Sequence, residues 1–300
     1  MDSLAGAFTA IWRTPMPKKT AVIHATNVSE GWADIFNLVM AAPGAKAGPI
    51  VLELEAQNGV AVETPIIRQL VDEELKKHDK FSIDTTSFLI FPWKLWNMLG
   101  QPDLTRFTDI YLKKVFPALK RRGPMHNSHG TYFQRMIQFS GFSETAGVRK
   151  EKEVNQLQRI LEIWGKAEQK GRHPRHSALQ ATIFDPAKDH HGAALCVFPC
   201  LQQVSFNYHD NFLTINAYYP TQYLFDRGYG NYLGLCQLGQ FMAKQMGLTF
   251  SGLVCFIGSC HLGGAGITKQ TLTPLKSRIE DYHKKICSGA LQIPAEVRGT

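Results

Sequence analysis

The carboxy-terminal third of the chain most constrains the fold, because strand and helix patterns follow one another there at short spacing. Residues 203–208 and 212–219 alternate between apolar and polar side chains, which is typical of β-strands. Residues 231–246 predict a helix with one buried stripe, and residues 253–258 predict a further short apolar strand. Such a succession favours one domain in which helices pack on a sheet.

The preceding part of the chain is mostly helical in pattern. Helical spacing of apolar residues recurs over residues 29–42, 65–78, 107–119 and 154–166. Pro92 interrupts an apolar stretch at 88–99, and short strand patterns cover 49–54 and 178–184. Residues 1–20 predict an irregular amino-terminal arm, and residues 120–128 a flexible loop. No repeat or linker divides the chain, so we predict a single α+β domain over residues 1–300.

The composition is that of a globular protein with a basic surface. The chain is 44% hydrophobic and has a formal net charge of +8. This charge leaves two interpretations open, a solvated basic surface or a surface that attracts phosphates or nucleic acid. Neither a secretory signal nor an apolar run of about 20 residues is present, so we expect a cytoplasmic protein without a membrane partner. The six cysteines form no Cys-x-x-Cys pair, so we expect reduced thiols and no metal.

Three short segments resemble the thymidylate synthase family in order and spacing. Cys200 follows Phe-Pro as the family's nucleophile does in its Pro-Cys-His segment. Asn231 stands where the family has the base-reading Asn of Pro-Phe-Asn, and His261 where it has the ribose-binding His of Gly-Asp-x-His-x-Tyr. From Cys200 to Leu262 the spacing matches without a gap. Weaker similarity extends upstream over most of residues 30–265.

The resemblance implies a fold, an assembly and a reaction. The family has a twisted mixed sheet with helices on one face, and the other face pairs with a second copy in a homodimer. Its cysteine thiolate adds to C6 of a pyrimidine, and C5 then accepts a one-carbon unit from 5,10-methylenetetrahydrofolate. By this resemblance Cys200 is the catalytic nucleophile, and Asn231, His261 and Ser205 contact a pyrimidine nucleotide or nucleoside. The alternative for Cys200 is an inert buried thiol.

Several positions depart from the family pattern. Pro220 replaces the arginine that binds the nucleotide phosphate, and Ser177-Ala178 replaces the arginine pair that the partner subunit lends to the same phosphate. Tyr223 replaces the aspartate that contacts the folate pterin, and Trp93 replaces the proton-relay glutamate. Each lost arginine removes charge-assisted hydrogen bonds of about 1.5–3 kcal/mol. We therefore do not expect ordinary methylation of deoxyuridine monophosphate, and we expect that nucleotide to bind weakly.

Other residues are candidates for the lost roles. Arg227 lies near the substrate mouth in the family layout, although a surface ion pair also explains it. Arg175 lies two residues upstream of Ser177-Ala178 and could replace the lost pair only if the start of the strand shifts. At the folate-binding positions stand Trp93, Trp96 and Tyr223, although tryptophans pack in cores more often than they bind cofactors. A different base, such as His129 or Glu162, would have to take the C5 proton.

Two functions therefore stay open. The first is divergent methyl or hydroxymethyl transfer to a pyrimidine. The second is a non-catalytic homologue that binds a nucleotide or nucleic acid, or serves as a scaffold.

Overall fold

The structure is a computed structural model of the chain. This structure describes residues 19–122, 130–145, 148–190 and 200–288. Most of the predicted arm at 1–20 and of the predicted loop at 120–128 lies outside the described residues. No helix within the described part of the chain is long and apolar enough to cross a membrane.

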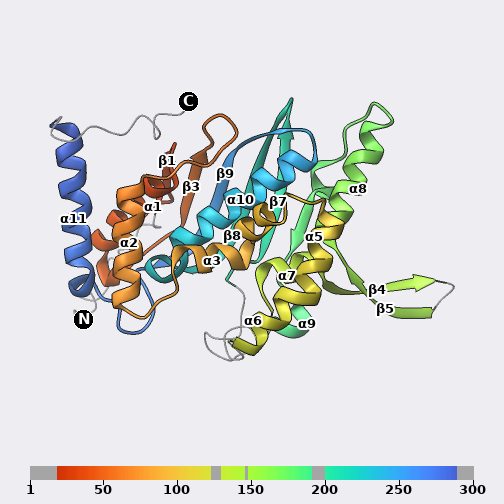
Figure 1. The fold of residues 1–300 in the computed structure, drawn as a ribbon. Helices are drawn as coiled ribbons and strands as arrows, with labels where there is room; N and C mark the ends of the chain where they lie inside the picture. The colour runs from red at the N-terminus through yellow and green to blue at the C-terminus, as the bar shows by residue number, and fades with distance from the viewer. Residues whose placement is uncertain (1–18, 123–129, 146–147, 191–199, 289–300) are drawn as a thin grey trace, which may run out of the picture.

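A mixed sheet forms the centre of the fold (Figure 1). Its strand order is β1-β3-β9-β8-β7-β6, with β2 paired to β9. The pairs β1–β3 and β8–β9 are parallel, and the other pairs are antiparallel. The strands are β1 (Ala21–Ala25), β2 (Lys46–Ala47), β3 (Ile50–Glu55), β6 (Gln180–Thr182), β7 (Gln203–His209), β8 (Phe212–Tyr223) and β9 (Thr249–His261).

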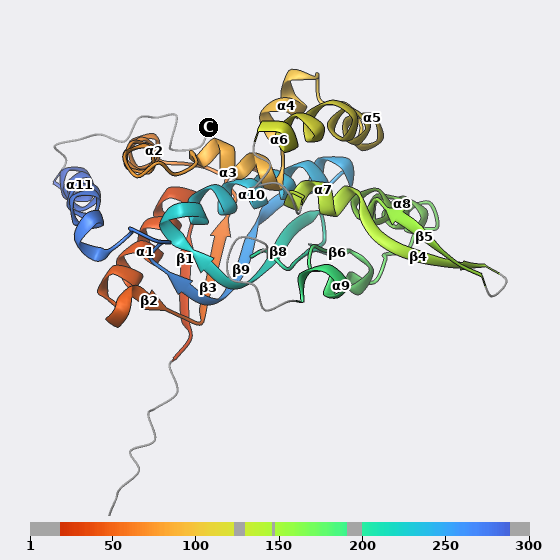
Figure 2. The ribbon, with the colours of Figure 1, turned by 90° about the horizontal axis from the view of Figure 1, so that it is seen from below.

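Helices pack on the sheet and at its ends. They are α1 (Val28–Ala41), α2 (Pro65–Lys77), α3 (Ile83–Ile90), α4 (Trp93–Met98), α5 (Leu104–Ile110), α6 (Phe116–Arg122), α7 (Tyr132–Ile137), α8 (Gln156–Glu168), α9 (Pro186–Asp189), α10 (Tyr229–Gln245) and α11 (Lys269–Cys287). Short helical turns are η1 (Pro43–Ala45), η2 (Tyr111–Val115), η3 (His176–Ala178) and η4 (Leu224–Gly228). The hairpin of β4 (Phe139–Thr145) and β5 (Val148–Val154) projects from the body (Figure 2).

Helix α10 is the central helix, because it contacts β8 and β9 and also packs against α3. Gly230 and Gly234 make the contact between α10 and α3 possible. A Cβ atom at Gly230 would lie 2.5 Å from Thr86 Cβ, and one at Gly234 would lie 2.8 Å from the Ser87 carbonyl oxygen. Side chains at these two positions would push the helices apart. The amino-terminal end of α10 is thus fixed between the sheet and α3.

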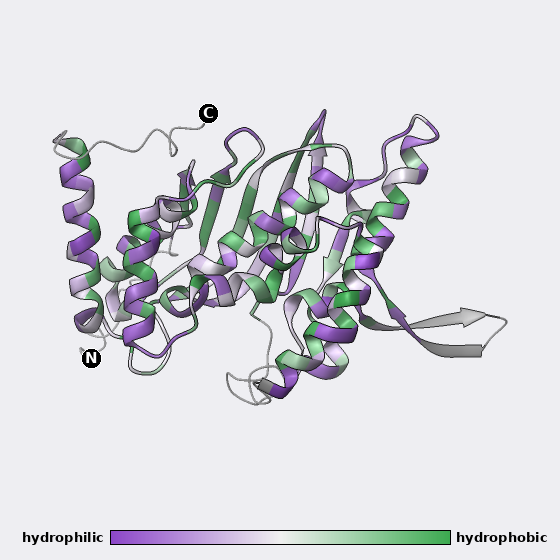
Figure 3. Cartoon of the chain, in the orientation of Figure 1, coloured by the Kyte–Doolittle hydropathy of each residue, from purple (hydrophilic) through white to green (hydrophobic). Residues whose placement is uncertain are grey.

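The buried and exposed residues of the strands follow the predicted alternation over most of their length. In β8, Leu213 and Ile215 are fully buried, whereas Thr214 and Asn216 are partly exposed. Helix α11 is hydrophilic over most of its surface (Figure 3) and buries only Leu272, Leu275 and Ile279. The core is therefore one layer between the sheet and its helices, as the hydrophobic content of the chain allows.

Strands β8 and β9 change this alternation at the same point. In β8 the buried residues Tyr219 and Gln222 are three apart, and in β9 their register partners Ile257 and Cys260 are also three apart. Pro220 has no N–H for the ladder, and a Cβ at its neighbour Gly258 would lie 2.8 Å from the Pro220 carbonyl oxygen. Beyond this point, the side chains that face α10 are therefore those that uninterrupted alternation would have placed on the other face of the sheet.

The α+β class and the mixed sheet agree with the sequence prediction, and the helices at 29–42, 65–78, 154–166 and 231–246 are found within one or two residues. Several elements were not predicted, among them the short helices α3, α7 and α9. Three larger features were also missed. These are strand β1, the hairpin β4–β5 and helix α11. The strand predicted at 253–258 is the middle of the 13-residue strand β9. The element predicted at 107–119 is longer, because α5, η2 and α6 continue one another from Leu104 to Arg122.

The face of the sheet opposite α10 exposes aromatic side chains. Tyr218 is 43% exposed and Phe256 is 39% exposed. They are register partners on β8 and β9, and their ring centroids are 5.7 Å apart. An exposed aromatic pair in the middle of a sheet is typical of an interface. The predicted homodimer, which stays a prediction, would bury this pair.

We expect Tyr218→Asp and Phe256→Asp to convert a dimer to a monomer, because each places a charge in the centre of the predicted interface. Sedimentation velocity at micromolar concentration measures the change. Met98→Asp is the matched control, since Met98 is 84% exposed on α4 and should leave the assembly unchanged. A wild-type chain that sediments as a monomer would contradict the prediction.

Candidate functional site

The Cys200 thiol lies at the sheet, just before β7. Gln202 N–H donates to the Tyr218 carbonyl oxygen at 3.0 Å, and its own carbonyl accepts from Ile183 N–H at 2.8 Å. These bonds hold the segment that follows Cys200 against the sheet. The side chain of Leu201 is fully buried, whereas Cys200 remains partly exposed. Cys200 is thus a partly exposed residue that is fixed in position.

Arg227 is the cation beside this thiol. It belongs to η4, the turn that joins β8 to α10, and its guanidinium lies 4.5 Å from the centroid of the Phe81 ring. Burial raises the pKa of Cys200, and the charge of Arg227 opposes this by lowering that pKa. A neighbouring cation is the usual means by which proteins make a thiolate available near neutral pH. The other interpretation that the sequence left open, a surface ion pair, does not fit Arg227, because its Nη1 atom is fully buried.

Three tyrosines interact electrostatically with Cys200. Burial raises the pKa of Tyr132, and the charge of Cys200 raises it further, whereas the charge of Arg227 lowers it. The Tyr132 hydroxyl also lies within reach of the backbone amides of Cys200 and Leu201, which lower the same pKa. Burial is likewise the main cause of the raised pKa of Tyr219 and of Tyr223, and Cys200 contributes to both. The three hydroxyls therefore stay protonated and are hydrogen-bond donors near the sulfur.

His261 joins the site through Tyr223. The two residues are register partners at the ends of β8 and β9, and their ring centroids are 5.7 Å apart. His261 Nε2 lies 3.2 Å from Ser259 Oγ. Burial lowers the pKa of His261, and the nearby charge of Lys46 lowers it further. A neutral imidazole at this place can donate or accept a hydrogen bond, but it cannot supply a permanent positive charge.

Asn231 lies at the start of α10 and is only 2% exposed. The next residue, Tyr232, donates its hydroxyl to Gln222 Oε1 at 2.5 Å, which fixes this end of α10 to the end of β8. The structure thus places Asn231 in the helix that covers the site strands. Its direct contact with a ligand stays a prediction.

Ser205 and Arg175 are not brought into this group. Ser205 lies on β7 opposite Asn216, whose amide nitrogen donates to Ser205 Oγ at 3.3 Å. Its neighbours Val204 and Phe206 are fully buried, so strict alternation turns Ser205 to the other face. Arg175 is exposed and precedes η3, beyond strand β6. Neither contacts the described residues around Cys200.

The two tryptophans proposed for cofactor binding lie in an aromatic cluster. Trp96 is 1% exposed, its indole N–H donates to the Pro102 carbonyl at 2.9 Å, and its ring packs edge-on against Phe241. It therefore has no face available for a cofactor in this conformation. Trp93 is partly exposed and its ring lies 5.2 Å from that of Trp96. It remains the only one of the pair that a folate could contact.

Of the two bases considered for the C5 proton, only Glu162 lies within the described residues, and it is not at the site. Glu162 Oε2 pairs with Arg159 on the exposed surface of α8 at 3.1 Å. His129 lies outside the described residues. The carboxylate of Asp226 acts on the pKa of Tyr223 and of Arg227. Its Oδ2 contacts Lys80 Nζ at 3.3 Å and accepts from Gly264 N–H at 3.2 Å.

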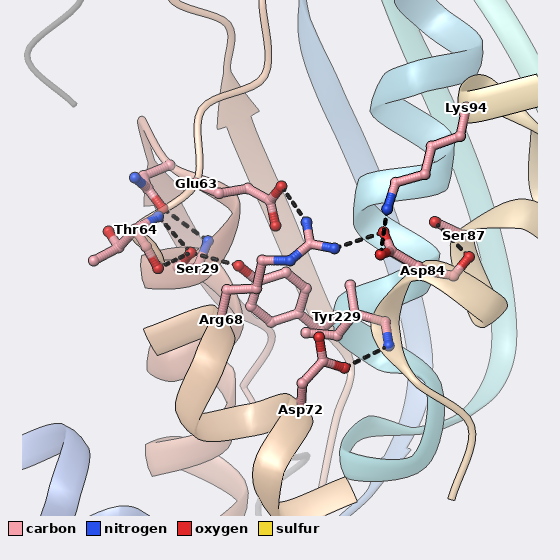
Figure 4. Close-up of polar contacts among 11 residues, drawn as sticks. Ser29, Glu63, Thr64, Arg68, Asp72, Asp84, Ser87, Lys94 and Tyr229 are labelled. Carbon is pink, nitrogen blue, oxygen red and sulfur yellow. Dashed lines mark hydrogen bonds and ion pairs between the residues drawn. The ribbon is translucent and has the colours of Figure 1, made fainter. Parts of the chain in front are cut away.

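A polar network fixes the amino-terminal end of α10 from the other side (Figure 4). Arg68 lies between two carboxylates, with 2.6 Å from Nη1 to Glu63 Oε2 and 2.6 Å from Nη2 to Asp84 Oδ1. Tyr229, the first residue of α10, shares a hydrogen bond of 2.5 Å with Ser29 Oγ. This network links α1, α2, α3 and the start of α10, two residues after Arg227 in the sequence.

The site consists of a reachable thiol, a buried cation, three hydroxyl donors and a neutral histidine. Sequence reasoning found Cys200, Arg227, Tyr223 and His261, but it did not assign Tyr132 or Tyr219 to the site. No cluster of His, Cys, Asp and Glu that could hold a metal is found among the residues that the structure describes. No protein-family model matches the chain, and no curated protein matches it.

We expect Arg227→Gln to raise the pKa of the Cys200 thiol, because the substitution removes the charge that opposes the effect of burial. The rate of alkylation of Cys200 by iodoacetamide follows the thiolate fraction, so its pH profile should move to higher pH. Arg175→Gln is the control, since this exposed arginine is remote from the thiol. An unchanged profile for Arg227→Gln would show that the cation does not act on Cys200.

We expect Arg68→Met to lower the free energy of unfolding by about 1–3 kcal/mol, because it leaves two partly buried carboxylates without their shared partner. Lys94→Met is the control. Lys94 Nζ also contacts Asp84 but is exposed, so its loss should cost less than about 1 kcal/mol. Urea denaturation measures both values, and equal values would contradict this ranking.

Proposed function

We propose that the protein is a thiolate-dependent transferase of the thymidylate synthase type. It would transfer a methyl or hydroxymethyl group to C5 of a pyrimidine nucleotide or nucleoside and would use 5,10-methylenetetrahydrofolate as the one-carbon donor. The observation that carries this proposal is Arg227 beside the partly exposed Cys200, since a cysteine with no chemical role does not require a buried cation.

In this reaction the Cys200 thiolate forms a bond to C6 of the pyrimidine. The electron pair of the C5–C6 double bond moves toward C5 and the O4 oxygen, and C5 then attacks the methylene carbon of the folate. Loss of the C5 proton to a base would expel the folate nitrogen as its C–N bond breaks and would leave an exocyclic methylene at C5. A hydride from the resulting tetrahydrofolate would complete a methyl group there, or water would complete a hydroxymethyl group, and either addition would restore the C5–C6 double bond as the thiolate leaves. Asn231 would pair with the O4 and N3 edge of the base, and His261 would hold the sugar.

The substrate would not be held as in ordinary thymidylate synthases. Pro220 and Ser177-Ala178 replace the phosphate arginines of that family, and Tyr223 replaces the aspartate at the pterin position. Trp93 stands at the position of the relay glutamate, so the proton route must differ. We therefore propose a substrate other than deoxyuridine monophosphate as the physiological pyrimidine. A homodimer is part of the proposal, and the exposed pair Tyr218 and Phe256 supports it.

A second candidate function is non-catalytic binding of nucleotide or nucleic acid. The main effect on the Cys200 pKa is burial, which disfavours the thiolate. The turn after α8 also has exposed cations that form no ion pair within the described residues, at Lys170, Arg172 and Arg175. Such a turn can contact phosphates. Binding of single-stranded DNA that weakens steeply with salt would favour this candidate.

We expect a covalent adduct between Cys200 and a 5-fluoropyrimidine deoxynucleoside in the presence of the folate, because fluorine at C5 blocks the proton loss that releases the enzyme. Intact-mass spectrometry measures the adduct. Cys200→Ser should abolish it, and Cys287→Ser, which removes an exposed cysteine of α11, should not.

The monophosphate form of the same pyrimidine is the second arm of that experiment. No adduct with either form, together with equal nucleotide binding by wild type and Cys200→Ser, would show that Cys200 has no covalent role and would favour the binding function.

A further inference from the structure

The end of helix α8 and the turn that follows it gather exposed cations with little neutralising charge. Four cations there are exposed and form no ion pair within the part of the chain that the structure describes, and they are Lys166, Lys170, Arg172 and Arg175. Residues 163–176 contain a single carboxylate, that of Glu168, against these four cations. Such a concentration of one sign of charge creates a positive potential that attracts polyanions.

The backbone of the turn is fixed by the end of the helix. The Ala167 carbonyl oxygen accepts from Lys170 N–H at 3.0 Å and from Arg172 N–H at 2.9 Å. Gly171, which lies between the two cations, has a φ of +58°. This left-handed conformation is the one in which glycine commonly ends a helix. The backbone therefore holds Lys170 and Arg172 at set positions beside one another.

Tyr208 of β7 anchors the second half of the turn. Its hydroxyl donates to the Pro174 carbonyl oxygen at 2.7 Å. The His176 ring stacks on the Tyr208 ring, with 4.5 Å between the centroids and 15° between the planes, and the His173 ring lies 5.6 Å from the same ring. The buried ring of Trp164 packs edge-on against Tyr208 at 5.0 Å. The core of the protein thus supports the two imidazoles.

His173 and His176 are exposed although both pack against Tyr208. An aromatic ring that is supported on one side and open to solvent on the other is a platform on which a nucleobase can stack. The bases of a duplex stack on one another, so a single strand is the form of nucleic acid that can use such a ring. An acidic peptide would use the cations of the turn but not its rings.

We propose that the turn binds a single strand of nucleic acid, with phosphates on Lys170 and Arg172 and a base stacked on His176. The inference goes beyond the proposed transfer reaction, because it does not involve Cys200. It rests on the second candidate function for the class of partner, and it gives that partner a place on the molecule and a mode of binding. The turn would show little preference for sequence, since every base has a face that can stack.

Fluorescence anisotropy of a labelled oligothymidylate tests the proposal with the full-length chain. For a single strand, each phosphate that a cation neutralises contributes about 0.7 to the steepness with which log affinity falls against log salt concentration. The double variant Lys170→Gln with Arg172→Gln should therefore reduce that steepness by about 1.4. The matched control is Lys284→Gln with Lys285→Gln, which removes two exposed cations of α11 at the other end of the molecule and should change nothing (Figure 1).

The stacked ring has a test of its own. His176→Ala should weaken binding by about fivefold or more, because it removes the ring on which the base stacks. His24→Ala is the control, since His24 is an exposed histidine of β1, at the opposite edge of the sheet from β6 and β7. A duplex of the same sequence should bind less tightly than the single strand. Thermal unfolding shows that each variant is folded.

Several results would overturn the proposal. A parent chain that binds no oligonucleotide would reject it together with the second candidate function, but would leave the transfer reaction untouched. Binding that the turn variants leave unchanged would keep the second candidate function and reject this location. A duplex that binds as tightly as the single strand, or a polyglutamate peptide that competes equally well, would show a general surface for polyanions in which the rings have no role. The fluoropyrimidine adduct at Cys200 is independent of all these results.

Discussion

The parallel pairing of β8 with β9 is the constraint on which the site depends. Along most of their length these two strands present the same alternation to α10, and at Tyr219 and Ile257 they change it together. Because both strands change at one register position, their backbones stay paired while their side chains exchange faces. Gln222 and Cys260 then face the helix, and Tyr223 and His261 become partly exposed. The change in the strands thus creates a polar end on an otherwise apolar sheet.

Arg227 gives this polar end its electrostatic character. Burial acts on the arginine and on Cys200 in opposite directions, since it lowers the pKa of the first and raises that of the second. Each group partly relieves the other, because a thiolate beside a guanidinium is less costly than either charge alone. The same cation is therefore available to a thiolate. The network around Arg68 holds Tyr229, which begins α10 two residues after Arg227 (Figure 4).

The sequence predicted the class of fold and part of the site. Alternation in 212–219 and the helical spacing of 231–246 are local patterns, and the structure has the corresponding elements. Cys200 and His261 were singled out because their segments resemble those of thymidylate synthases; His261 contacts Tyr223, and Cys200 acts on the pKa of the same tyrosine. Tyr132 was not assigned to the site, since it comes from α7 and reaches the thiol only through tertiary packing. The resemblance put Ser205 at the substrate, whereas alternation along β7 turns it to the other face of the sheet. Pro220 gives a signal for the change of face, but its pairing with Gly258 is not visible in one sequence.

The two glycines of α10 have a consequence for how the site can vary. Gly230 and Gly234 set the separation between α10 and α3, and the contacts that they permit are with Thr86 and Ser87 rather than with flexible side-chain ends. Arg227, Tyr229 and Asn231 precede or begin this helix within five residues, so they move with it as one unit. A larger residue at either glycine would displace the cation and the amide together. The chemistry of the site can thus change by exchange of individual side chains, whereas its spacing is inherited from a helix–helix contact that lies outside it.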